Sequence, residues 1–202
     1  MPLILRESSG KDFEPVPAGT HQAVCFRIWD LGTQPGGQWD PKRQILISWE
    51  LPEQRIDIDG NDLPMSLSRR FTNSLHKKST LRPFLEGWRG RQFSNEELMG
   101  FDLTSIVGVN CMLQVMHRES NNRTFANITA AMPLMANFEK LKPENTSFCW
   151  SLDDGTPIPE ETPKWVSELI EGSAEWNNEA EAILANDRPV TETPPEDDDI
   201  PF

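Results

Sequence analysis

Cysteine is scarce in this sequence, with three residues among 202. Cys25, Cys111 and Cys149 lie far apart and form no C-x-x-C pair. This spacing argues against a disulfide framework and against a cysteine-based zinc site. Sparse, unpaired cysteines are typical of a protein kept in a reducing compartment. We therefore expect a cytoplasmic protein.

Long apolar runs are also absent. No stretch of the chain approaches the roughly 20 apolar residues that a membrane-spanning helix needs. The apolar patch at residues 2–5 is too short for a signal peptide, and no basic residues lead into it. We expect no membrane partner.

Catalytic and metal-binding motifs are missing as well. His21, His76 and His117 are scattered, and none has a cysteine or an acidic residue at metal-ligand spacing. The stretch DIDGND lacks the later ligands of a calcium loop and is better interpreted as a hairpin turn. With no P-loop, G-x-S-x-G motif or Cys–His pairing signature, we expect no cofactor, no metal and no enzyme activity.

Charge is distributed very unevenly. Residues 1–140 carry 16 Lys and Arg against 16 Asp and Glu, whereas residues 141–202 carry 3 against 16, which accounts for the whole net charge of −13. Within the neutral part, residues 66–93 hold seven basic side chains and Glu86 as the one acid. Such asymmetry indicates nucleic-acid contact or an interaction tail.

Alternating hydrophobicity predicts five strands, within residues 20–31, 44–51, 64–72, 106–116 and 123–131. In the first strand, Val24, Phe26 and Ile28 share one face, and Ala23, Cys25, Arg27 and Trp29 share the other. Trp49 and Phe71 are expected in the core. A long Gly/Pro loop is expected over residues 33–43, and a hairpin turn at Asp59 and Gly60.

Two short helices, over 79–90 and 94–101, are predicted between the third and fourth strands, the second opened by a capping box from Ser94 to Glu97. Five strands with a helical connection at this point indicate a mainly β protein with the OB-fold, a five-stranded Greek-key barrel. An SH3-like barrel or an irregular sandwich fits the strand count nearly as well.

Three regions follow from these patterns. Residues 1–140 form the predicted barrel. Residues 141–186 form an acidic extension, expected as loop until a short helix at 162–172 whose stripe of Trp165, Val166, Leu169 and Ile170 packs on the barrel or on a partner. Residues 187–202 are Pro-rich and acidic, a composition that predicts a disordered tail.

The chain ends in DDDIPF, comprising Asp197, Asp198, Asp199, Ile200, Pro201 and Phe202. This ending resembles the acidic C-terminal tip of bacterial single-stranded DNA-binding proteins. The resemblance covers about 3% of the chain, and residues 1–140 do not match that family's opening sequence. It implies a tip that docks replication, recombination and repair enzymes. The mismatch of the body, together with the small size, suggests a bacteriophage or mobile-element protein that acts in the cytoplasm of a bacterial host.

Single-stranded nucleic acid is bound by cations that contact phosphates and by aromatic rings on which bases stack. The outward positions of the predicted barrel and the loop after its first strand supply both. The predicted single-stranded-DNA-binding residues are Arg27, Trp29, Trp39, Lys42, Arg43, Arg70, Lys77, Lys78 and Phe125.

The sequence therefore predicts a sequence-independent single-stranded DNA-binding protein that coats DNA and recruits enzymes through its tip. Two other functions stay open, namely a DNA mimic or decoy that competes for the host's docking pockets, and a recombination mediator. A pure mimic has no use for the basic segment 66–93. The choice between monomer and homo-oligomer, and between DNA and RNA, is also open.

Overall fold

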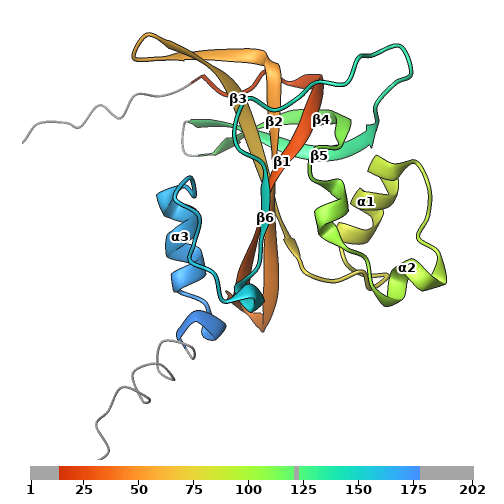
Figure 1. Ribbon diagram of the computed structural model, residues 1–202, viewed down its shortest axis with the longest axis vertical. Coiled ribbons are helices and arrows are strands. Elements are labelled where there is room, and N and C mark those ends of the chain that lie inside the picture. Colours follow the sequence, from red (N-terminus) through yellow and green to blue (C-terminus); the bar gives the residue numbers. More distant parts are fainter. Residues whose placement is uncertain (1–13, 121–122, 178–202) are drawn as a thin grey trace, which may run out of the picture.

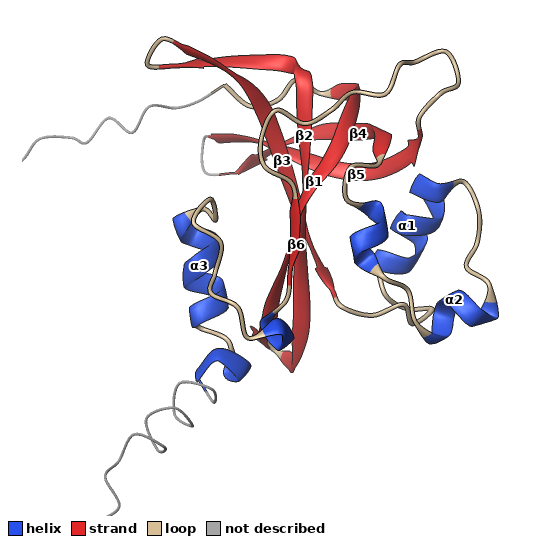
Figure 2. Ribbon diagram, viewed as in Figure 1, coloured by secondary structure: helices blue, strands red, loops and turns tan. Residues whose placement is uncertain are grey.

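The computed structural model describes residues 14–120 and 123–177. In chain order its elements are β1 (Gly19–Gly36), β2 (Trp39–Ile58), β3 (Asn61–Thr72), α1 (Leu81–Arg89), α2 (Asn95–Met99), the 3-10 turn η1 (Leu103–Ile106), β4 (Asn110–Ser120), β5 (Arg123–Pro133), β6 (Phe148–Trp150), the 3-10 turn η2 (Leu152–Asp154) and α3 (Lys164–Glu171) (Figure 2). The predicted class, mainly β with a few short helices, is confirmed.

The strands form one sheet in the order β3-β2-β1-β4-β5, with antiparallel neighbours throughout. β1 lies at the centre. On the edge away from β2, its residues 19–24 pair with β4 and its residues 27–29 pair in parallel with β6. In Figure 1 the long β1 and β2 run up the middle, with α1 and α2 on one side and α3 on the other.

The β2–β3 hairpin turns where the sequence predicts. Asp59 and Gly60 both have positive φ angles, 55° and 84°, as a two-residue type I′ turn requires. The Asp57 carboxylate accepts a hydrogen bond of 2.9 Å from the Gly60 N–H and so holds the turn in place. The predicted hairpin is confirmed.

The main core lies between the sheet and α1. Trp49 and Phe71 are buried there, as predicted. Phe84 of α1 contacts both of them, with ring centroids 5.6 Å from Trp49 and 5.0 Å from Phe71. The predicted helices are confirmed, and both hydrogen bonds of the Ser94–Glu97 capping box are formed. The core therefore fixes α1 against the inner face of β2 and β3.

The expected faces of β1 are partly wrong. Ala23 and Cys25 belong to the main core, and so does Ile28. The register with β2 shifts between Cys25 and Arg27, and such a bulge moves every later side chain to the other face. Trp29, expected to face outward, is 2% exposed.

A second core explains the burial of Trp29. It lies on the outer face of β1 and β2 and is completed by β6, η2 and α3; its buried members are Trp29, Leu31, Leu46, Trp150, Leu152, Val166 and Ile170. Segment 148–154 was expected to be loop, and that prediction is wrong. Residues 141–177 therefore pack on the outer face of β1 and β2, and the helix stripe is buried at Val166 and Ile170, while Trp165 remains 48% exposed.

The expected long loop at 33–43 is also wrong. β1 continues to Gly36, turns through Gly37 and Gln38, and pairs back along β2. Register shifts at Asp30/Gly32 and Gln34/Gly36 allow the glycines and Pro35 to fit within a hairpin. A Gly/Pro-rich composition therefore marked bulges here and not a loop.

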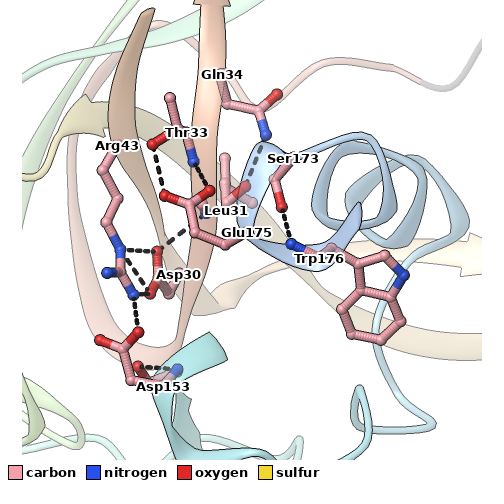
Figure 3. A network of polar contacts seen from close by, with 11 residues as sticks. Asp30, Leu31, Thr33, Gln34, Arg43, Asp153, Ser173, Glu175 and Trp176 are labelled. Atoms are coloured by element: carbon pink, nitrogen blue, oxygen red, sulfur yellow. Dashed lines mark hydrogen bonds and ion pairs between the residues drawn. The ribbon is translucent and has the colours of Figure 1, made fainter. Parts of the chain in front are cut away.

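A polar network fastens this hairpin to the extension (Figure 3). Arg43 forms an ion pair with Asp30 and another, of 2.8 Å, with Asp153 of η2. The Thr33 N–H and hydroxyl both donate to the Glu175 carboxylate, at 2.7 and 2.6 Å. Through these bonds the extension is joined to β1 and β2 by charge as well as by apolar contact.

At Gly32 the backbone of β1 lies very close to the extension. A Cβ at this position would lie 2.6 Å from Ser173 and 2.8 Å from Leu152. We expect Gly32→Ala to destabilise the protein by about 2–4 kcal/mol, combining a left-handed backbone conformation with overpacking. Urea unfolding followed by tryptophan fluorescence measures the change.

Gly37→Ala is the matched control. Gly37 has nearly the same φ angle, 63° against 65°, but no atom lies within 4 Å of its added Cβ. The difference between the two variants therefore isolates the contact with Ser173 and Leu152. Equal destabilisation of both would contradict the proposed close approach.

Candidate nucleic-acid interface

Three of the seven cations in the basic segment 66–93 are paired with acidic side chains of the protein itself. Arg82 pairs with Glu86 at 3.0 Å, and Arg89 and Arg91 both pair with Glu97. Hydrogen bonds from Arg91 and from the Ser94 N–H lower the pKa of Glu97 to about 2. These arginines stabilise the α1–α2 region and are not free to contact a ligand.

Arg69 has a structural role at the seam between β3 and β5. No backbone ladder joins these two strands among residues 14–120 and 123–177. Instead the Arg69 guanidinium donates to the carbonyls of Ile128 and Thr129 of β5, both at 3.1 Å. It also lies over the rings of Phe71 and Phe84, 4.9 and 5.0 Å from their centroids.

Among the cations that have no acidic partner within the described part of the chain, four occupy one region. They are all exposed, and they lie at the ends of β2 and β3 and in the loop before α1; the set, called here the basic cluster, is Lys42, Arg70, Lys77 and Lys78. All four were predicted binding residues, and β2–β3 pairing brings Lys42 close to the end of β3, where the Asn73 N–H donates to the Arg43 carbonyl at 2.9 Å.

Two members of the basic cluster line one pocket of about 360 Å³. Its lining consists of Lys42, Thr72, Ser74, His76, Lys78, Ser79 and Thr80. The lining contains hydroxyls, an imidazole and two ammonium groups but no carboxylate. Cations and hydroxyl donors are the groups that proteins use to bind phosphate oxygens.

Local hydrogen bonds hold the loop that forms the pocket. The Ser74 hydroxyl accepts from the His76 N–H at 3.1 Å, and His76 Nδ1 accepts from the Lys78 N–H at 3.2 Å. The Ser79 hydroxyl accepts from Leu81 at the start of α1, also at 3.1 Å. The pocket wall is therefore ordered by its own short-range contacts.

The remaining predicted binding residues lie elsewhere. Arg27 donates to the carbonyls of Thr146 and Glu161 of the extension, and Arg43 is engaged by carboxylates. Trp29 is inside the second core, so its predicted exposure to a DNA strand is wrong. Trp39 opens β2, and its side chain is outside the described part.

Phe125 is exposed as predicted, at 48%, but it is separated from the basic cluster. It lines a groove with Met65, Ser66 and Leu67, whereas the basic pocket contains Thr72. Four residues of β3 lie between the nearest lining residues, Leu67 and Thr72, which are about 17 Å apart along the strand. The structure thus gathers the cations but not the aromatic residues predicted with them.

Sequence reasoning missed the polar lining of the pocket. Thr72, Ser74, His76, Ser79 and Thr80 were given no binding role. Their signal is the density of hydroxyl and basic residues in NSLHKKST, directly before an apolar helix. The tip, Asp197 to Phe202, lies outside the described residues.

The described residues give little support for metal binding, a membrane-spanning helix or thiol chemistry. They contain no group of three or more His, Cys, Asp or Glu side chains arranged to hold a metal ion, and no helix in them is long and apolar enough to cross a membrane. Burial raises the pKa of the Cys25 and Cys111 thiols, which keeps them protonated and unreactive.

Neither models of known protein families nor curated proteins match this chain.

Substitutions at the adjacent residues Arg69 and Arg70 should distinguish a residue that stabilises the fold from one that is free to bind a ligand. We expect Arg69→Met to lower the free energy of unfolding by about 1–3 kcal/mol, because two hydrogen bonds from a charged donor are lost. Arg70→Met, at an exposed position, should change stability by no more than about 0.5 kcal/mol. Thermal and urea unfolding measure both, and equal effects would refute the seam role of Arg69.

Proposed function

We propose that this protein binds single-stranded DNA without sequence preference, anchoring backbone phosphates at the basic cluster. The observation that carries the proposal is the convergence of Lys42 and Lys78 on one hydroxyl-lined, carboxylate-free pocket. The whole chain has a net charge of −13. A pocket of this chain that is lined by two lysines without acidic partners among the described residues, and by no acidic side chain, is suited to binding a polyanion. The proposed role is binding and not catalysis.

The strand order supports an OB-fold assignment. An OB barrel pairs its first strand with the second and fourth, and the third and fifth strands meet to close it. The order β3-β2-β1-β4-β5, with α1 between β3 and β4, has these neighbours. We propose that the Arg69 contacts at the β3–β5 seam take the place of the closing ladder.

The extension restricts where a DNA strand can lie. It covers the outer face of β1 and β2, where Leu46, Ser48 and Glu50 are buried. Glu50 accepts hydrogen bonds from the backbone N–H groups of Glu144 and Asn145, which hold the extension across that face. We therefore place the DNA along the β3 side of the barrel, next to Arg70 and the pocket.

A second function is proposed for the C-terminal tip. Its resemblance to the tip of bacterial single-stranded DNA-binding proteins supports enzyme recruitment through Phe202 and the aspartates before it. An apolar ring beside a free carboxylate provides one apolar and one charged contact for a docking pocket. DNA binding and recruitment would then belong to separate, oppositely charged parts of the chain.

Salt dependence tests the phosphate contacts. With about −0.7 per phosphate contact on a single strand, four cations predict a slope of log K against log salt near −2.8. Fluorescence anisotropy with labelled oligo-dT measures it. Lys42→Gln/Lys78→Gln should reduce the slope by about 1.4 and weaken binding equally on other base compositions.

Lys140→Gln/Lys164→Gln makes the same charge change on other parts of the chain, at exposed positions in the β5–β6 loop and on α3. It should leave the slope within error of the unmodified protein. If both double variants lose the same affinity, binding responds to net charge alone, and the pocket assignment is wrong.

Removal of residues 187–202 tests the division of roles. DNA affinity should stay equal or rise, because acidic residues that repel DNA are removed, while binding to an enzyme that docks on bacterial tips should be lost. Anisotropy and co-purification measure the two properties. A truncated protein that no longer binds DNA would refute the separation.

A further inference from the structure

An apolar groove of about 480 Å³ lies at the opposite end of β3 from the basic cluster. It is bounded by Ile56 and Ile58 of β2, Met65 and Leu67 of β3, and Phe125 of β5. Glu14 is the one charged residue in its lining. A groove that is apolar and bears a negative charge is poorly suited to a phosphate backbone.

The end of the β2–β3 hairpin, residues 55–67 and called here the β2–β3 arm, supplies half of the lining residues. Ile56 pairs with Leu63, and Ile58 with Asn61, so Ile56, Ile58 and Leu63 share one face of the arm. The other face is polar and is tied down by Arg55, which pairs with Asp62 at 3.1 Å and with Glu144. A two-stranded ribbon with an uncovered apolar face is marginally stable in water.

The chain itself leads into the groove. Glu14, Pro15 and Val16 are part of its wall, so the preceding residues start from the groove. Those residues include the apolar run Leu3, Ile4 and Leu5, followed by the polar stretch RESSGKD. The nine residues from 5 to 14 can span up to about 30 Å, and a tether of this length gives an effective concentration on the order of millimolar.

We propose that residues 3–5 of the same chain pack into this groove and cover the apolar face of the β2–β3 arm. The N-terminal run then acts as an intramolecular strap over Ile56, Ile58 and Met65, next to Phe125. This proposal is independent of DNA binding and explains why the arm carries an apolar face that extends beyond the edge of the main core.

The full-length protein with Leu3→Asp/Ile4→Asp/Leu5→Asp tests the strap. Amide hydrogen exchange of residues 55–67 should accelerate by about tenfold or more because local opening of the arm becomes easier, and peroxide oxidation of Met65 should accelerate too. Met99, 91% exposed on α2, is the internal reference and should not change. Ser8→Asp/Ser9→Asp/Gly10→Asp adds the same charge outside the apolar run and should leave both rates unchanged.

Cross-linking identifies the occupant. Ile4→Cys combined with Ile58→Cys should form a disulfide within one chain under mild oxidation, because the proposed packing places the two positions together. A covalent dimer instead would assign the groove to a second copy and overturn the proposal. Unchanged exchange and oxidation in the Asp variant would overturn it as well.

Discussion

The guanidinium of Arg69 joins two strands that would otherwise be the open edges of the sheet. Its two bonds to β5 carbonyls and its position over Phe71 and Phe84 connect the seam to the main core. Burial lowers the pKa of Arg69, and the carbonyl and ring partners offset this desolvation. Because Phe84 belongs to α1, the same contacts hold the helix that follows the basic pocket.

The extension is as much a part of the fold as the barrel strands. It contributes a strand to the sheet, four residues to the second core and the carboxylates that neutralise Arg43 and hold Thr33. Its acidic composition therefore has two parts, a folded one that pairs with the barrel's own cations and the tail beyond. The basic cluster, at the β3 side where binding is proposed, forms no ion pair with the described part of the extension.

Local patterns in the sequence predicted local structure well. The Asp59–Gly60 turn, the Ser94 capping box and the burial of Trp49 and Phe71 all follow from signals within a few residues. The β1 bulge did not, because both faces of β1 are buried and carry apolar residues, which hides the change of face in the hydrophobic pattern. Lys42 and Lys78 were identified by charge alone, whereas the engagement of Arg43 by Asp153 depends on a contact between distant parts of the chain. The same holds for Trp29, whose covering residues come more than a hundred positions later.

The parallel pairing of β6 with β1 has a consequence during synthesis. β1 leaves the ribosome long before its partner, so Trp29, Leu31 and Leu46 are exposed to water while the chain is still being made. At 5–20 residues per second, the approximately 30 residues from 140 to 170 take roughly 2–6 s to translate. The nascent chain thus presents an apolar surface for seconds, which makes chaperone contact the natural safeguard against aggregation.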